Sequence, residues 1–205
     1  MNAHAHEQGK LERLTFFSDA VFAIAMTLLV IEVRVPHLAV QSDRALARAL
    51  VDLVPNYIGF IVSFVVIARF WMAHHRLMGL LERGDQRLVR ANLALLMAIA
   101  FMPFPTAVLS DYAIERVAVG FYAVWLMLVG LANLAVIGCA LGGRRLVRAD
   151  ADAAEIAEIL RLRGIPLLVG ALALAAGMIA PHAGLLMLLV GTPLLMWLMT
   201  PQRSG

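Results

Sequence analysis

The chain has 205 residues, of which 62% are hydrophobic and only 15% are charged, and its formal net charge is +3. A soluble domain is about half apolar and about a quarter charged, so this composition excludes an ordinary soluble domain. Because the basic residues lie in short segments between long apolar blocks, they indicate orientation in a membrane rather than nucleic acid binding, and the single Cys139 excludes an intrachain disulfide.

Six apolar blocks follow one another along the chain. Each is long enough to cross a hydrocarbon core about 30 Å thick as a helix that rises about 1.5 Å per residue. The blocks cover residues 15–34, 53–73, 90–110, 117–141, 164–181 and 183–200. We therefore expect an all-α integral membrane protein with six transmembrane helices, in which residues 1–10 form a cytoplasmic tail and residues 11–205 form a single domain.

The distribution of lysine and arginine predicts the orientation of these helices. With six spans, both termini and the loops on their side hold 13 of the 17 basic residues. The other four, Arg34, Arg44, Arg48 and Arg116, fall on the opposite side. Since basic loops stay in the cytoplasm, both termini are expected there.

The first apolar block has one face that carries a line of branched side chains. A helix that started at the Ser-Asp pair inside this block would be too short to span a membrane, so we expect it to begin near Leu11. At helical spacing i, i+3, i+4 and i+7, one face then holds Ile24, Thr27, Leu28 and Ile31. This face could pack against lipid or a partner helix, or it could form a hydrophobic constriction that controls ion passage by dewetting.

Polar residues of the first three blocks are expected to meet near the cytoplasmic side. An aspartate at membrane depth must find partners, because an unpaired charge there is costly. The antiparallel arrangement of the helices predicts one polar layer that contains Arg13, Ser18, Asp19, His74, His75 and Asn92. Its expected role is to hold the three helices together. A gating or proton-sensing role is the alternative, because histidine titrates near neutral pH, and either histidine could serve it.

The cytoplasmic connection over residues 142–163 contains a basic cluster and then a short amphipathic pattern. Its apolar positions are Ile156, Ile159, Leu160 and Leu162. This pattern is compatible with a helix on the membrane surface or against a neighbouring subunit. The interpretation that we favour from the sequence is a solvated connector.

Four stretches of the first three blocks resemble one family. The stretch RLTFFSD, residues 13–19, matches a RxxxFSD motif on the first helix of the transmembrane protein 175 family of potassium channels. The stretches AIAMTLLVIEV, WMAHHRL and NLALLMAIAFMPFPT, which begin at residues 23, 71 and 92, are also similar to that family. The resemblance follows all six blocks in order and is sharp in the first three.

This resemblance implies a potassium-selective leak channel, permeable to K⁺ and other monovalent cations, that lacks the TVGYG filter. Counted from the motif, the positions implied to form the pore constriction and gate are Ile24, Leu28 and Ile31, and the position implied to contribute selectivity is Thr27. A chain with one six-helix unit is implied to form a homotetramer in the lipid bilayer of the bacterial inner membrane. No cofactor, metal or nucleic acid partner is implied.

A secondary transporter and a membrane enzyme are the alternatives to a channel. A small proton-coupled secondary transporter could use Asp19 and the histidines, but the sequence shows no inverted repeat and no pair of broken helices near the midplane. A membrane enzyme would need a catalytic constellation, and the sequence contains no HExxH, GxSxG or cysteine–histidine cluster. We therefore expect a protein that is not an enzyme.

Overall fold

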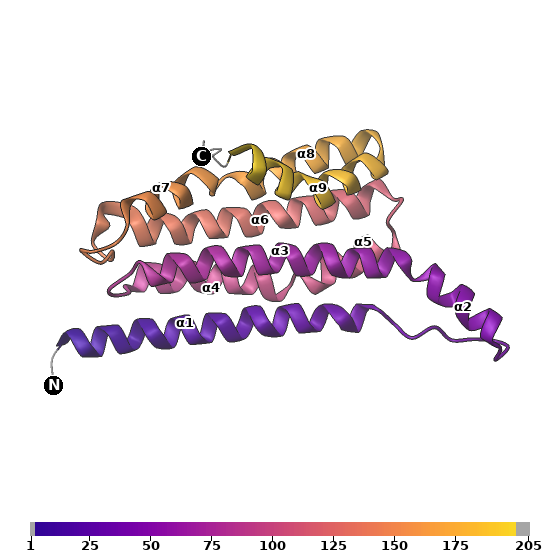
Figure 1. Ribbon diagram of the computed structural model, residues 1–205, viewed down its shortest axis with the longest axis horizontal. Coiled ribbons are helices and arrows are strands. Elements are labelled where there is room, and N and C mark those ends of the chain that lie inside the picture. The colour runs from indigo at the N-terminus through magenta and orange to yellow at the C-terminus, as the bar shows by residue number, and fades with distance from the viewer. Residues whose placement is uncertain (1–2, 200–205) are drawn as a thin grey trace, which may run out of the picture.

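The computed structural model describes the backbone of residues 3–199 and the side chains of residues 9–191. Within these ranges, long helices lie side by side, with α1 at one edge of the bundle and α8 and α9 at the other (Figure 1). The elements are α1 Ala3–Leu28, η1 Leu29–Glu32, α2 Asp43–Asp52, α3 Val54–Gly79, α4 Gln86–Ala100, α5 Pro103–Asp111, α6 Arg116–Leu141, η2 Gly142–Arg144, α7 Ala153–Leu162, α8 Ile165–Ile179 and α9 Pro181–Met199. The all-α prediction is confirmed.

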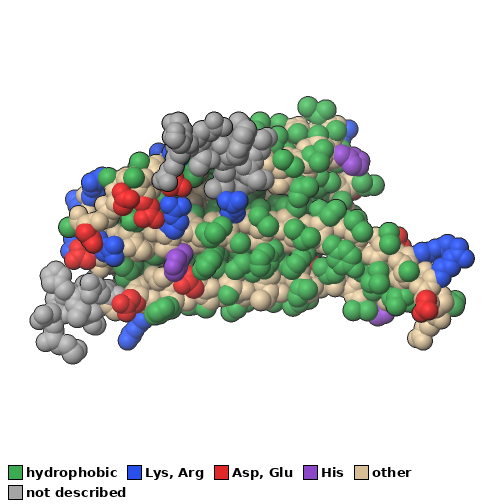
Figure 2. Space-filling view, viewed as in Figure 1, with side chains coloured by type: hydrophobic (Ala, Val, Ile, Leu, Met, Phe, Trp, Pro, Cys, Tyr) green, Lys and Arg blue, Asp and Glu red, His purple; other side chains and the backbone are tan. Residues whose placement is uncertain are grey.

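The surface of the bundle is that of a multi-pass membrane protein. On the face that Figure 2 shows, hydrophobic side chains cover the middle, whereas most charged side chains lie toward the two ends. In the described part of the chain, 5 helical segments are long and apolar enough to cross a membrane: Gly9–Glu32, Val54–Gly79, Gln86–Asp111, Arg116–Arg144 and Ala153–Ile179. The sixth block corresponds to α9, whose described apolar part, Pro181–Gly191, is shorter. Six spans and cytoplasmic termini therefore stay predictions.

The first helix is longer than the sequence analysis predicted. It begins at Ala3 rather than near Leu11, and η1 continues it to Glu32. Residues 3–10 contain alanine, glutamate, glutamine and lysine, which all favour a helix. At about 1.5 Å per α-helical residue and about 2 Å per 3₁₀ residue, α1 and η1 together are about 47 Å long. The helix therefore exceeds the thickness of the hydrocarbon core.

The third block consists of two helices rather than one. Helix α4 ends at Ala100, and α5 begins at Pro103. Pro103 has no N–H, and its ring would clash with the carbonyl group one turn earlier in a continuous helix. Proline is well suited to the first turn of a new helix, which is where Pro103 and Pro105 lie.

Helix α2 was not predicted from the sequence. Its N-cap is Ser42, whose Oγ accepts a hydrogen bond of 3.2 Å from the amide of Ala45. Serine at this position satisfies one of the free amides at a helix start, so the Ser-Asp pair at 42–43 was an available signal. Helix α2 extends beyond the end of the bundle (Figure 1).

The bundle is organised around α6, which contacts α4, α5, α8 and α9, while α1 contacts α3 and α4. Helices α8 and α9 form a tight antiparallel pair. A Cβ atom on Gly184 would lie 2.8 Å from Gly177 Cα and 2.6 Å from Val119 Cγ1. The two backbones therefore approach one another at a distance that only glycine permits, as is common in membrane helix pairs.

The connection over residues 142–163 is docked onto its own chain, so the solvated-connector interpretation is wrong. The Glu82 amide donates to Leu146 O over 2.8 Å, and the Arg148 amide donates to Leu80 O over 2.9 Å. In α7, Ile156 and Ile159 are buried, as their amphipathic spacing allows. The sequence shows that such a helix has an apolar face, but not which surface covers it.

Candidate ion pathway

One face of α1 is buried in the bundle, and the face that carries the predicted pore residues is not. Ser18, Phe22, Ala25 and Leu29 are almost completely buried. By contrast, Ile24, Leu28 and Ile31 are 57%, 39% and 63% exposed. Thr27 is exposed as well. The four side chains that share one face by sequence spacing therefore also share one uncovered surface of the single chain.

The 3₁₀ segment η1 changes the position of Ile31 on this face. An α-helix turns by 100° per residue, which would place Ile31 60° away from Leu28. A 3₁₀-helix has three residues per turn, so residues three apart are eclipsed. Because η1 begins at Leu29, Ile31 lies almost directly above Leu28 along the helix. The change of helix type extends the apolar line.

The hydroxyl group of Thr27 makes a hydrogen bond within α1. Its Oγ1 donates to Ile24 O at 2.8 Å. Threonine side chains in helices commonly bond to a carbonyl group one turn earlier. This bond fixes the side chain on the exposed face next to Ile24.

A pocket of about 260 Å³ adjoins the outer end of this face. Leu28, Ile31 and Glu32 form one wall, and Phe101 and Phe104 lie on the other side, at the break between α4 and α5. Phe101 and Phe104 also contact each other, with ring centroids 5.2 Å apart. The proline break thus creates an apolar recess beside the uncovered face of α1.

A chain of three buried polar side chains connects α1, α3 and α4. Asn92 Nδ2 donates to Ser18 Oγ at 2.9 Å, and Asn92 Oδ1 lies 2.7 Å from His74 Nε2. All three residues are at most 1% exposed. Since the amide oxygen can only accept, Nε2 of His74 carries the hydrogen in this arrangement. His74 Nδ1 is buried without a partner among the described residues.

A second, more exposed cluster lies on the neighbouring side of α1. Trp71 Nε1 donates to Asp19 Oδ1 at 2.8 Å, and His75 Nδ1 is 3.8 Å from the same oxygen. The side chains of Asp19 and His75 are 30% and 58% exposed. The indole and imidazole rings also contact each other, with centroids 5.5 Å apart. His74 therefore belongs to the buried chain, and His75 belongs to the exposed cluster around Asp19.

The structure does not place Arg13 in either cluster. Arg13 is exposed, and in the described part of the chain no hydrogen bond or ion pair joins it to the other five predicted members of the layer. Its spacing explains this difference. Arg13 precedes Ile24 by 11 residues, about three helical turns, so both lie on the same face. The predicted layer was based on the depth of the residues in the membrane alone. The angle of Arg13 around the helix places it on the face of Ile24, away from the other five residues.

Three buried hydroxyl groups in the middle of the bundle were not predicted from the sequence. Thr106 Oγ1 lies 2.7 Å from Ser63 Oγ, which is 2.9 Å from Tyr122 Oη. These residues connect α5, α3 and α6 and are almost completely buried. Ser63 is an isolated hydroxyl within an apolar run, and this was the available signal. Hydrogen bonds between helices are how membrane proteins satisfy such groups.

These features identify the protein as a multi-pass α-helical membrane protein whose first helix has an uncovered, mostly apolar face. The sequence profile of the family described as endosomal/lysosomal potassium channel TMEM175 matches residues 13–103. The chain is 35% identical to a potassium channel of Streptomyces collinus over 195 residues, which are 91% of this chain and 92% of that one. It is 43% identical to a potassium channel of Chamaesiphon minutus over 122 residues, which are 58% of this chain and 60% of that one.

A solved structure is similar over nearly the whole fold. The crystal structure of a lysosomal potassium-selective channel TMEM175 homolog from Chamaesiphon minutus superposes with a TM-score of 0.81 and 30% identity. The match covers 93% of this chain and 98% of that chain. The chain belongs to the TMEM175 family.

Proposed function

We propose that this protein is a potassium-selective cation channel whose pore is lined by α1. The observation that carries this proposal is the uncovered face of α1, where Ile24, Leu28 and Ile31 are exposed beside a single hydroxyl group. Its membership of the TMEM175 family supports the proposal, because the similar bacterial proteins are named potassium channels.

The proposed pore requires more than one copy of the chain. A single apolar helix face cannot enclose a pathway, whereas copies related by a closed rotation place the same face around a common axis. We propose a homotetramer in which each copy contributes its α1. Ile24, Leu28 and Ile31 then form successive apolar rings that gate the pore by dewetting.

In this pore, Thr27 provides the side-chain oxygen closest to the rings at Ile24 and Leu28. One hydroxyl group from each copy offers a permeating ion few ligands in place of its hydration shell. The preference for K⁺ over other monovalent cations is therefore modest, and a largely hydrated ion passes the apolar rings.

The proposed topology has both termini in the cytoplasm and six spans in the bacterial inner membrane. Residues 1–10 form the cytoplasmic end, and residues 11–205 form one channel domain. The excess of Lys and Arg on that side supports this orientation. The Ser18–Asn92–His74 chain holds α1 against α3 and α4, so its role is structural and it does not line the pathway.

The test is a planar-bilayer recording of the purified protein, first under a K⁺ gradient and then with Na⁺ replacing K⁺ on one side. We expect discrete current steps and a reversal potential displaced toward the K⁺ equilibrium value. A silent bilayer together with saturable, proton-dependent uptake into liposomes would overturn the proposal and indicate a transporter. In that case the Asp19–His75 cluster, which is partly exposed, would be the first site to examine.

A further inference from the structure

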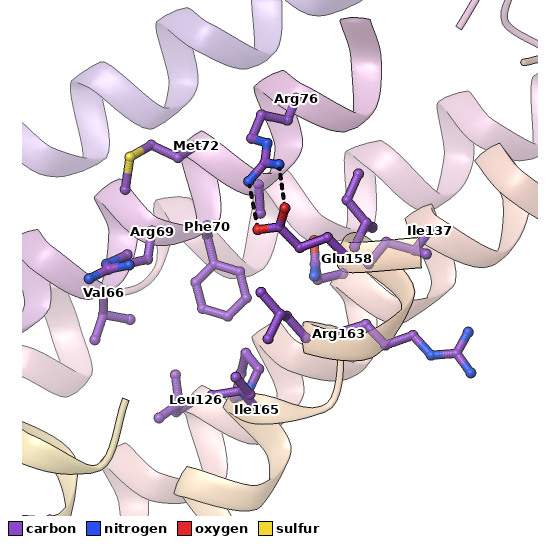
Figure 3. A pocket seen from close by; sticks show the side chains of 15 residues that line it. Val66, Arg69, Phe70, Met72, Arg76, Leu126, Ile137, Glu158, Arg163 and Ile165 are labelled. Atoms are coloured by element: carbon purple, nitrogen blue, oxygen red, sulfur yellow. Dashed lines mark hydrogen bonds and ion pairs between the residues drawn. The ribbon is translucent and has the colours of Figure 1, made fainter. Parts of the chain in front are cut away.

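A cavity of about 250 Å³ lies between α3, α6 and the junction of α7 with α8 (Figure 3). It is on the opposite side of α3 from α1 (Figure 1). Phe70, Leu126 and Ile165 belong to its walls and are each at most 5% exposed. Pockets for drug-sized molecules measure about 300–1,000 Å³, and an apolar cavity of about 150 Å³ can bind benzene. The volume of this cavity therefore suits a small molecule whose body is apolar.

A buried amide without a partner lines this cavity. Asn133 is 5% exposed, and in the part of the chain that the structure describes no hydrogen bond involves its side chain. Leu126 and Ile137 lie seven residues before it and four after it and line the same cavity, so Asn133 shares the face of α6 that points into it. Buried polar side chains are nearly always paired, and an exception indicates a missing partner.

The helices across the cavity contribute apolar groups next to this amide. Val66 and Phe70 of α3 belong to the walls, and α8 begins there with Ile165 and Pro166. Pro166 has no N–H group that could be donated to the amide oxygen. Membrane helices usually satisfy a buried amide by a hydrogen bond to a neighbouring helix. Here the partner has to come from a molecule inside the cavity.

The charged side chains of the cavity do not select a charged ligand. Arg76 is paired with Glu158, with Nη2 3.1 Å from Oε2. Arg69 takes part in an interaction of its own. The guanidinium group of Arg163 points away from the other labelled side chains (Figure 3). The polar group that a ligand would meet inside the cavity is therefore the neutral amide of Asn133.

We propose that the cavity binds a small neutral alcohol, whose hydroxyl group pairs with Asn133 and whose hydrocarbon part lies between Phe70 and Leu126. The amide donates from Nδ2 and accepts at Oδ1, and a hydroxyl group can accept and donate in turn. An ether oxygen can only accept, and an ammonium group can only donate. Water could pair with the amide, but only a ligand with a hydrocarbon part also gains from contact with the apolar walls.

The test is photolabelling of the purified full chain with an octanol that carries a diazirine in its hydrocarbon chain, followed by mass spectrometry of the peptides. We expect label on the parts of α3, α6 and α8 that line the cavity. Unlabelled 1-octanol should compete about fivefold better than octyl methyl ether, because the ether cannot donate to Oδ1 and one neutral hydrogen bond contributes a factor of about this size.

Asn133→Leu tests the amide, because leucine keeps a branched side chain and removes both polar atoms. Labelling should weaken about fivefold, and 1-octanol and the ether should become equal competitors. Without alcohol, this variant should unfold at no lower temperature than the unaltered protein, since no partner in the described chain is lost. The matched control is Asn56→Leu, whose amide donates to Asp111 and does not line the cavity.

A second variant tests the space without changing the amide. Ala73 lies at the exposed rim of the cavity, so Ala73→Leu narrows the cavity without disturbing the core. We expect this variant to weaken labelling as well. Equal labelling of Asn133→Leu and the unaltered protein would overturn the proposal, and so would an equal loss in Asn56→Leu.

Two further outcomes would overturn it in favour of another occupant. Stronger competition by octanoate than by 1-octanol would indicate a site for an anion. Absence of label from the cavity lining would show that water or another copy of the chain fills this space. The experiment measures no current, so its result is independent of whether the protein conducts K⁺.

Discussion

Single residues on the uncovered face of α1 differ in what they offer a permeating ion. Ile24, Leu28 and Ile31 are apolar and branched, and Thr27 is the hydroxyl among them. Each of these side chains can be changed without opening the buried side of the helix. They are therefore the positions at which function can be separated from folding.

Thr27→Val should reduce the preference for K⁺ over Na⁺, because valine keeps the shape of threonine and removes its oxygen. We expect the permeability ratio to fall about threefold, which corresponds to a differential interaction of about 0.7 kcal/mol. The measurement is the reversal potential under bi-ionic conditions. Thr15→Val is the control, since Thr15 makes the same kind of bond, to Leu11 O at 3.0 Å, three turns away. An unchanged reversal potential in Thr27→Val would contradict the assignment.

Ile24→Asn should raise single-channel conductance severalfold, because an amide in the apolar ring removes the barrier to wetting. The control is Ile61→Asn in α3, where the isoleucine is 55% exposed, close to the 57% of Ile24. Polar substitution on a lipid-facing surface should leave conductance unchanged. If both variants conduct like the unaltered protein, Ile24 lies outside the gate.

At the scale of elements, the polar contacts of α1 separate into a buried chain and an exposed cluster. Sequence spacing places Ser18 and Asp19 on different sides of the helix, and the structure gives each its own partners on α3 and α4. Two adjacent histidines therefore perform different tasks. Adjacent residues of a helix point about 100° apart, so only one of them can face Asn92.

His74→Phe should destabilise the protein more than His75→Phe. Loss of the His74 side chain leaves the buried oxygen of Asn92 without its partner, which costs about 1–3 kcal/mol. His75 is 58% exposed, and its replacement should change stability by less than about 0.5 kcal/mol. Thermal unfolding in detergent compares the two variants directly. Equal midpoints would show that the buried chain contributes no stability.

The α8–α9 pair provides a second test at this scale. In Gly184→Ala the new Cβ would lie 2.8 Å from Gly177 Cα and 2.9 Å from Ala173 O, and backbone atoms cannot move aside cheaply. We expect overpacking to lower the free energy of unfolding by about 1–3 kcal/mol. Gly138→Ala in α6 is the matched control, because nothing lies within 4 Å of its new Cβ. In that variant the higher helix propensity of alanine should raise the free energy of unfolding by about 0.5–1 kcal/mol. An equal loss of stability in both variants would refute the packing argument.

At the scale of the whole molecule, the uncovered face of α1 predicts that several copies act together. If unaltered and Ile24→Asn chains of the proposed tetramer are expressed together, channels with zero to four altered copies should form. We therefore expect five conductance classes, whose proportions follow the mixing ratio. Single-channel recording of the mixture distinguishes this from a dimer, which would give only three classes.

Much of this architecture could be predicted from the sequence because it depends on local pattern. The apolar blocks, the shared face of Ile24 and Leu28, and the family follow from composition, spacing and motif, and the all-α membrane fold and the family are confirmed. The sequence could not show which of His74 and His75 joins the buried chain, because this depends on the rotation of α3 against α4. The docking of α7 likewise depends on contacts distant in sequence, such as Arg76 with Glu158.

The hydrogen bond of Thr27 to its own backbone has a consequence for the sign of the charge that can pass. Because the hydroxyl hydrogen is already donated to Ile24 O, the side chain can present only its lone pairs to the proposed axis. Where a largely hydrated ion replaces even one water at this ring, K⁺ would find an oxygen ligand, whereas chloride would need a group that donates hydrogen, and the Thr27 hydroxyl offers none. The proposed pore would therefore favour cations over anions through a neutral residue, without a ring of acidic side chains.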